Sequence, residues 1–338
     1  MQTFTRHLPM TFLPETKPKT AILLDIETTG LSPDLSTVFL IGCGYHEDQC
    51  LHTIHWLADT YDLNEEQSIL NAFTLWLKQR MDAYTTTQII TYNGQNFDLP
   101  FLKRRFEQCG LIFPLNPTLI EQNTDYFRCV SKHKHLWPLK DLKLHTFSKW
   151  LGQKTSNTPS GRQLIKTYHA YIKTKDPALL NLLFLHNIDD LKALSGVMSV
   201  DSYFNILKKI KVIQQVDSSK TALSIHIILD NKQPFPAELH LEKYNFRLNM
   251  NKNEMRIQIP VYPKGLRYYY TDIKNYVYLP EEDYVLHKSM AKYMNKNHWI
   301  KATSEICYTW IIPDQTFFTD FDQQKTYIQM ILQLFGLS

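Results

Sequence analysis

Two acidic residues, Asp25 and Glu27, stand two positions apart at the end of the apolar run 21–24. Alternate residues of a strand share a face, so both carboxylates should point the same way from the end of a buried strand. Like charges this close repel unless a cation lies between them, and Mg²⁺ typically takes one or two carboxylates plus a substrate phosphate. The alternative is a strand end with an exposed acidic turn, since short Asp-x-Glu patterns recur by chance.

A second acidic element lies near residue 98. The apolar strand expected at 88–92 runs into Asn93-Gly94, a strong turn signal, and Asp98 then begins an expected helix at 98–109. By position alone, Asp98 could be only a helix N-terminal carboxylate that interacts with the macrodipole. Asn93 could contact a substrate, or it could serve only the geometry of the turn.

A third element contains His186 and Asp190, which are four residues apart on an expected helix and therefore share a face. A pair at this spacing can also be a simple surface contact. A histidine near its ordinary pKa could accept a proton from water at neutral pH. The pair is therefore a candidate for proton transfer beside a metal site.

Together the three elements resemble the DEDD (DnaQ-like) 3′–5′ exonuclease superfamily, which has an RNase H-like fold. The string His186-Asn187-Ile188-Asp189-Asp190 is similar to the YprB-like branch, as is Trp150-Leu151-Gly152. The resemblance covers about residues 20–200. It implies a mixed five-stranded sheet flanked by helices and a hydrolase that releases mononucleotides from a 3′ end.

The resemblance also implies a site. Two divalent ions, Mg²⁺ or Mn²⁺, could hold a phosphodiester and activate the attacking water. The expected metal ligands are Asp25, Glu27, Asp98 and Asp190, with His186 as the general base. Four such carboxylates should titrate as a coupled set. Thr28 and Asn93 are predicted to contact the substrate.

The elements that position these residues can be expected from periodicity and turn signals. Strands are expected at 21–26, 37–45, 50–56 and 88–92, with helices at 64–81 and 98–109 and a helical region at 140–200. Asp176-Pro177 is typical of a helix beginning. The crossover should place strand 88–92 beside strand 21–26.

The 338-residue chain is long enough for two domains. We expect an N-terminal arm at 1–20, the RNase H-like domain at 21–200, a linker at 201–220 and a smaller α+β domain at 221–338. The five cysteines form no CxxC pair, which indicates a reducing compartment. No apolar run could span a membrane and no secretory signal begins the chain, so we expect a cytoplasmic protein.

The expected C-terminal domain carries a lysine pattern within a predicted helical segment, 281–301. Lys288, Lys292 and Lys296 are spaced four apart, and no acidic residue lies between Tyr284 and Ser304. This could be a phosphate-binding face with aromatic stacking for single strands. It could equally be an ordinary solvated lysine face.

These observations favour a metal-dependent nuclease, in particular a 3′–5′ exonuclease acting on DNA or RNA that is single-stranded or has a frayed 3′ end. The net charge of +4 permits nucleic-acid binding without demanding it. The alternatives are a non-catalytic nucleic-acid-binding protein and a nuclease that cuts internally. The C-terminal domain could also bind a protein partner.

Overall fold

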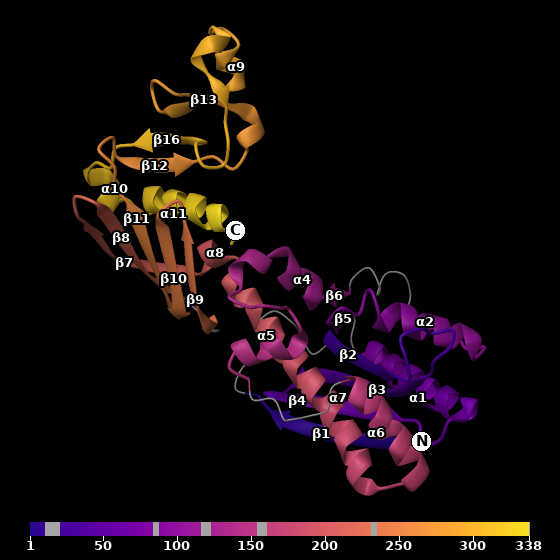
Figure 1. Cartoon of the computed structure of the whole chain (residues 1–338). Coiled ribbons are helices and arrows are strands. Elements are labelled where there is room, and N and C mark those ends of the chain that lie inside the picture. Colours follow the sequence, from indigo (N-terminus) through magenta and orange to yellow (C-terminus); the bar gives the residue numbers. More distant parts are fainter. Residues whose placement is uncertain (11–20, 84–87, 116–122, 154–160, 231–234, 338) are drawn as a thin grey trace. The chain divides into compact units, whose positions relative to one another are not determined.

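The computed structural model describes residues 1–10, 21–83, 88–115, 123–153, 161–230 and 235–337 (Figure 1). The chain forms two compact units, Met1–Ser199 and Val200–Ser338. Each unit has its own sheet and its own buried side chains, and each is described by itself.

The N-terminal unit is built on a mixed six-stranded sheet with the order β1-β4-β3-β2-β5-β6. The strands are β1 (Gln2–Pro9), β2 (Ala21–Thr28), β3 (Val38–Glu47), β4 (Cys50–Leu57), β5 (Gln88–Thr91) and β6 (Thr124–Asp125). Strands β1 to β4 pair antiparallel, and β5 pairs parallel to β2 and to β6. The expected position of β5 beside β2 is therefore confirmed.

The expected arm at residues 1–20 is wrong for its first half. Residues 2–9 form β1, which pairs with β4 along its whole length and makes the sheet six-stranded instead of five-stranded. Phe4 and Leu8 explain the pairing, because both side chains pack on the core beneath the sheet and Phe4 stacks on Phe184 at 5.0 Å. Residues 11–20 of the expected arm lie outside the described residues.

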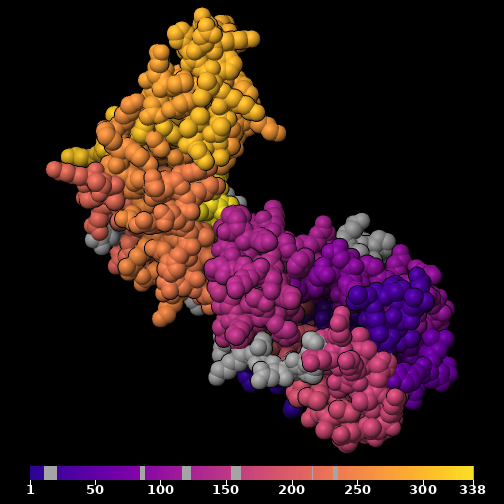
Figure 2. Space-filling model, in the orientation of Figure 1, coloured from indigo at the N-terminus to yellow at the C-terminus, as the bar shows by residue number. Residues whose placement is uncertain are grey.

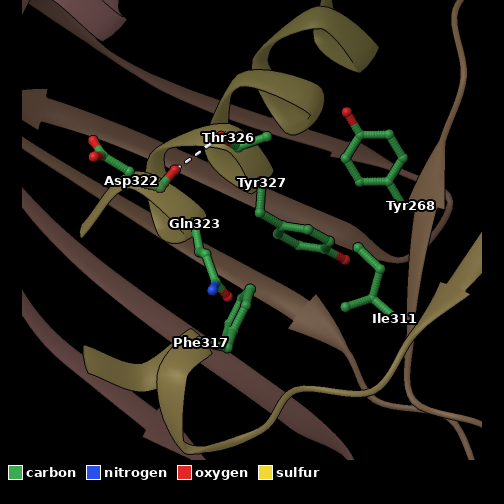
Figure 3. Close-up of a pocket in the computed structure, with 7 residues that line it drawn as sticks. All are labelled: Tyr268, Ile311, Phe317, Asp322, Gln323, Thr326 and Tyr327. Carbon is green, nitrogen blue, oxygen red and sulfur yellow. Dashed lines mark hydrogen bonds between the residues drawn. The ribbon is translucent and has the colours of Figure 1, made fainter. Parts of the chain in front are cut away.

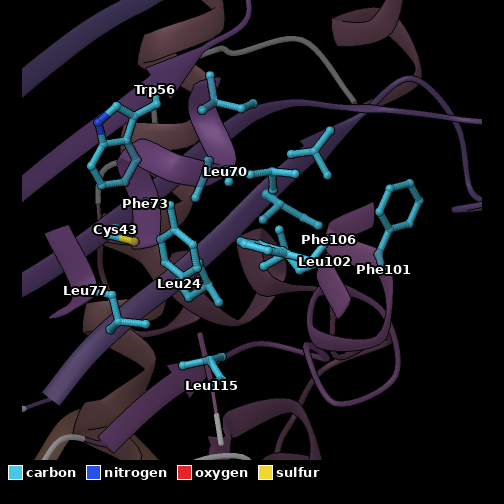
Figure 4. Close-up of a cluster of buried hydrophobic side chains, with 14 of the residues drawn as sticks. Leu24, Cys43, Trp56, Leu70, Phe73, Leu77, Phe101, Leu102, Phe106 and Leu115 are labelled. Carbon is cyan, nitrogen blue, oxygen red and sulfur yellow. The ribbon is translucent and has the colours of Figure 1, made fainter. Parts of the chain in front are cut away.

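Helices flank both faces of this sheet. They are α1 (Leu63–Ala83), α2 (Asp98–Gln108), α4 (Tyr126–Lys132), α5 (Leu144–Trp150), α6 (Gly161–Thr174) and α7 (Pro177–Val197). Alternate residues of β2 (Ile22, Leu24 and Ile26) pack with α1 and α2 in one large core (Figure 4). A second core contains side chains of β3, α6 and α7. Figure 2 shows α4 and α5 in magenta and α6 in pink on the surface of this unit.

Helix α7 begins as the sequence predicts. The Asp176 side chain accepts a hydrogen bond from the backbone of Ala178, and Pro177 occupies the first helical position, where its missing N–H costs nothing. The helix contacts β2, β3 and β4, so its residues face the opposite side of β2 from α1 and α2 (Figure 1). This is the side on which Asp25 and Glu27 lie.

The C-terminal unit is rich in strands. Its main sheet is antiparallel in the order β7-β8-β11-β10-β9, formed by β7 (Ile210–Ser218), β8 (Ala222–Leu229), β9 (Phe235–Lys243), β10 (Phe246–Lys252) and β11 (Glu254–Pro260). Two small sheets follow: β12 (Leu266–Tyr269) with β16 (Tyr308–Ile311), and β14 (Tyr284–His287), β13 (Tyr276–Leu279) and β15 (Ile300–Lys301). The helices are α8 (Ile206–Lys209), α9 (Lys288–Ala291), α10 (Gln315–Thr319) and α11 (Phe321–Phe335).

Two expectations for this unit are wrong. The expected linker at 201–220 contains α8 and the edge strand β7, because residues 210–218 pair with β8. The segment at 281–301, expected to be helical, instead contains the strands β14 and β15, and its helical residues are limited to the four-residue α9 and the 3₁₀ turn Lys296–His298. His287 caps the start of α9 and Asn295 caps the 3₁₀ turn, so two short elements replace one helix.

Candidate active site

Asp25 and Glu27 lie on β2 as the alternation predicts. Asp25 pairs with Gly42 of β3 across the sheet, and Glu27 pairs with Leu40. Since Ile26 between them packs in the core of α1 and α2, both carboxylates project toward α7. The strand therefore presents two carboxylates side by side.

Asp98 reaches the same place from the other side of β2. It is the first residue of α2, and its Oδ1 accepts a hydrogen bond from the Ile26 backbone N–H at 3.1 Å. This bond ties Asp98 to the strand position between Asp25 and Glu27. A carboxylate that serves only as a helix N-terminal group has no need of such a bond.

The turn that precedes Asp98 is held by Asp125, at the end of β6. Asp125 accepts hydrogen bonds from the backbone N–H groups of Asn93, at 2.7 Å, and Gln95, at 3.2 Å. Asn93 has a left-handed φ of 66°, and its side-chain oxygen accepts a bond from Asn96 at 2.9 Å. These contacts give Asn93 a role in turn geometry, and its contact with substrate stays a prediction.

His186 and Asp190 project from α7 toward these carboxylates. His186 Nε2 lies 3.3 Å from Glu27 Oε1 and 3.3 Å from Asp190 Oδ2. One ligand atom from each of these three residues lies within 4.8 Å of the others, an arrangement that could hold a metal ion. The shared helix face predicted for His186 and Asp190 is therefore the face that meets Glu27.

The structure adds a histidine that sequence analysis missed. His145 on α5 places its Nε2 2.9 Å from Asp190 Oδ1, and its ring lies 6.3 Å from that of His186. Asp190 thus has one histidine at each oxygen. No local motif marks His145, because its contact depends on how α5 packs against α7.

Burial and like charge act together on the carboxylates. Burial, followed by the charges of Asp190, Glu27 and Asp98, raises the pKa of Asp25 well above its usual range. Glu27 has its pKa raised in the same direction, first by burial and then by Asp190 and Asp98. Burial raises the pKa of Asp98 to about 7, although the Ile26 hydrogen bond opposes this. The site therefore concentrates negative charge that a cation would relieve.

His186 does not keep the ordinary pKa expected from the sequence. Burial lowers the pKa of His186, and the charge of Asp190 only partly opposes this. The neutral imidazole therefore persists to lower pH than in an exposed histidine. His145, by contrast, has its pKa raised, chiefly by its hydrogen bond to Asp190.

The sequence that forms this site matches a known family. Residues 22–200, more than half of the chain, match the family model of the RNase_H superfamily.

The chain belongs to the RNase H superfamily.

The fold matches 138 chains among solved structures. One is the family B DNA polymerase from the hyperthermophilic archaeon Pyrobaculum calidifontis, with 18% identity and a TM-score of 0.43 over 56% of this chain and 25% of the polymerase chain. A search of curated proteins found no match.

RNase H superfamily nucleases use divalent metal ions, and the residues of this member fit such ions. Asp25, Glu27, Asp98 and Asp190 supply hard oxygen donors, which Mg²⁺ and Mn²⁺ prefer. Burial and neighbouring carboxylates raise the pKa values of three of them, and a bound cation would favour their charged forms. His186 Nε2 lies next to Glu27 and Asp190.

The remaining predicted residues have contacts of their own. Thr28 ends β2 and donates its hydroxyl to the Gly30 carbonyl at 2.7 Å. Lys288 donates to the Lys274 carbonyl, and Lys292 Nζ lies 4.7 Å from the ring centre of the adjacent Tyr293. The three lysines, including Lys296, do not form one helical stripe, since α9 ends at Ala291.

The C-terminal unit also contains a pocket of about 330 Å³ between α10, α11 and the strands β12 and β16 (Figure 3). Its lining residues are Tyr268, Ile311, Phe317, Asp322, Gln323, Thr326 and Tyr327. Asp322 is the acidic residue of this set, so the pocket lacks the carboxylate pairing of the N-terminal site. Among the residues that the structure describes, no helix is both long and apolar enough to cross a bilayer.

Proposed function

We propose that this protein is a metal-dependent nuclease that hydrolyses phosphodiester bonds as a 3′–5′ exonuclease with two Mg²⁺ or Mn²⁺ ions. The observation that carries the proposal is the convergence of Asp25, Glu27, Asp98 and Asp190 from β2, α2 and α7 onto one buried site. Membership of the RNase H superfamily supports a nucleic-acid substrate. The YprB-like assignment and the cytoplasmic location stay predictions.

The carboxylates and His186 have different tasks in this proposal. Bound divalent ions would supply positive charge to the scissile phosphate and to the leaving oxygen. The four carboxylates would hold these ions, and the backbone N–H of Ile26 fixes Asp98 among them. His186 would accept the proton of the attacking water at Nε2, the atom that faces Glu27 and Asp190.

The test uses short end-labelled oligomers of single- and double-stranded DNA and RNA, each incubated with Mg²⁺, Mn²⁺ or EDTA. A metal-dependent ladder that shortens from the 3′ end would support the proposal and name the substrate. Internal fragments would instead indicate endonucleolytic cutting. Uncut substrate that still binds in a gel shift would favour a non-catalytic binding protein.

Replacing His186 by alanine should slow turnover and remove the acid limb of the pH–rate profile. Because burial lowers the pKa of His186, that limb should lie below the ordinary histidine value of 6.5. Initial rates between pH 5 and 9 measure this. His169, whose Nδ1 lies 2.7 Å from the Tyr61 hydroxyl on the surface, provides the control His169→Ala. An unaltered profile in the His186 variant would argue against His186 as the base.

Divalent metal should stabilise the protein more at pH 8 than at pH 5.5. The folded-state pKa of Asp98 is raised to about 7, so its proton is held more tightly in the folded state. Stability in EDTA should therefore fall as pH rises from about 4 through about 7, and metal should restore it. At about 100 times Kd, metal adds ~2.7 kcal/mol, which is roughly 5–10 °C in thermal midpoint for a unit of this size. Equal gains at both pH values would contradict this.

We also propose that Lys288, Lys292 and Lys296 contact the phosphates of bound nucleic acid. Residues 284–304 carry four lysines and no acidic residue, and the Tyr293 ring is 82% exposed beside Lys292. In a plot of the logarithm of the binding constant against the logarithm of the salt concentration, the double variant Lys292→Gln/Lys296→Gln should reduce the magnitude of the slope by about two. The control double variant Lys220→Gln/Lys325→Gln should leave this slope unchanged. An unchanged slope would leave this unit as a candidate surface for a protein partner.

A further inference from the structure

Three strands place a single row of residues beneath α7. Asp25 of β2 pairs with Gly42 of β3, and Gly42 pairs with His55 of β4. Directly paired residues point to the same face of a sheet. Since Gly42 has no side chain, the row leaves a gap between the Asp25 carboxylate and the His55 ring.

Asn187 of α7 fills that gap. Its Nδ2 donates to Asp25 Oδ2 at 2.6 Å, and its Oδ1 lies 2.7 Å from His55 Nδ1. A Cβ atom on Gly42 would come within 1.8 Å of Asn187 Oδ1. Gly42 is therefore required for the amide to occupy this position between the two side chains.

The hydrogen bonds of this row run in one direction. Because Asn187 Oδ1 is an acceptor, His55 must donate from Nδ1, and its Nε2 then accepts from the Thr53 hydroxyl at 2.9 Å. Thr53, His55 and Asn187 are all buried. Burial keeps His55 neutral, with its pKa lowered to about 4. Each donor thus points toward the Asp25 carboxylate, so the bonds polarise one another.

A neutral donor suits a site made of carboxylates. Lysine or arginine at this position would also hold Asp25, but its charge would offset the negative potential that attracts cations. The amide orients one oxygen of Asp25 without adding charge.

We infer that Asn187 is a positioning residue for metal binding, held by His55 and Thr53 and accommodated by Gly42, which fixes Asp25 for a divalent ion. This inference rests on the proposed metal-dependent function. Partners that orient metal ligands typically contribute 10–100-fold to metal affinity.

The experiment measures the Kd for Mn²⁺ alone, by the electron paramagnetic resonance signal of free Mn²⁺, in the full chain. Asn187→Leu keeps the branched shape of the side chain and removes both hydrogen bonds, and it should weaken Mn²⁺ binding about 10–100-fold. The matched control is Ser195→Ala, two turns further along α7. This variant also removes a buried hydrogen bond between α7 and a histidine, the one between the Ser195 hydroxyl and His46 Nε2 at 2.7 Å. That hydrogen bond is not part of the row that ends at Asp25. Its Kd should stay within about twofold of wild type.

Two further measurements apply if Asn187→Leu does not fold. Thr53→Val, at the far end of the row, should weaken Mn²⁺ binding by a smaller factor than Asn187→Leu does, because it removes only the last hydrogen bond of the row. Nitrogen-15 NMR of the wild-type protein at pH 7 should show His55 neutral and protonated on Nδ1. This second result does not depend on metal.

The outcomes separate the two proposals. Mn²⁺ binding by wild type and equally tight binding by folded Asn187→Leu would overturn the inference and leave the proposed function intact. His55 protonated on Nε2 would also overturn it. A wild-type protein that binds no Mn²⁺ would overturn the proposed function, and the inference with it.

Discussion

Replacing Asp25 by asparagine should lower phosphodiester cleavage by at least about 10³-fold while the protein stays folded. The variant removes one negative charge and keeps the acceptor for Asn187. Loss of metal-assisted charge stabilisation of about 4 kcal/mol corresponds to about three factors of ten in rate. Rates with end-labelled oligomers and thermal melts in EDTA measure the two effects. Asp190→Ala should give the same loss of activity.

The thermal melts should also show that repulsion among the carboxylates lowers the stability of the metal-free protein. Burial and three neighbouring carboxylates raise the pKa of Asp25, so removing its charge should raise the thermal midpoint of the metal-free protein. Asp34→Asn, an exposed change in the segment after β2, is the matched control and should change neither quantity beyond a small surface effect. Activity lost together with folding would not support the assignment of Asp25.

The largest expected effect on stability comes from a buried ion pair behind the site. Glu66 of α1 and Arg105 of α2 form two hydrogen bonds, Nε to Oε1 at 2.8 Å and Nη2 to Oε2 at 2.5 Å. Glu66 Oε1 also accepts from the Val38 backbone at 2.8 Å. Glu66→Ala leaves Arg105 buried without its carboxylate and should cost about 3–5 kcal/mol in the free energy of unfolding.

Urea unfolding of the variants tests this. Glu107→Ala, in an exposed pair with Arg104 at 3.3 Å, is the control and should cost less than about 1 kcal/mol. The double variant Glu66→Met/Arg105→Leu should recover much of the loss, because it leaves no unpaired buried charge. A Glu66→Ala variant as stable as the Glu107 control would show that the buried pair contributes little.

The parts of the site that follow from local periodicity could be predicted from the sequence. Strand alternation placed Asp25 and Glu27 on one face, and helical spacing placed His186 beside Asp190. The fold class was predicted from the same patterns together with the resemblance, and the mixed sheet flanked by helices confirms it.

The parts that depend on tertiary register could not be predicted. Asn187 is adjacent to His186, yet its role becomes visible only once β3 places Gly42 between Asp25 and His55. His145 likewise contacts Asp190 only through helix packing. Periodicity also gave a wrong prediction for the segment that contains Lys288, Lys292 and Lys296. There the side chains of His287 and Asn295 cap two separate short elements, so no single helix forms.

The row across the sheet makes the site sensitive to a distant turn. Asp48 and Gln49, with left-handed φ values of 47° and 60°, join β3 to β4 and set which residues oppose one another. A slip of one residue between β3 and β4 would turn His55 to the other face, so Asn187 Oδ1 would lose its hydrogen-bond donor. A chain with that slip could still bury much of its apolar surface, yet it would have lost the row of hydrogen bonds that positions Asp25. Metal affinity would then distinguish correctly paired molecules from misfolded ones in any preparation.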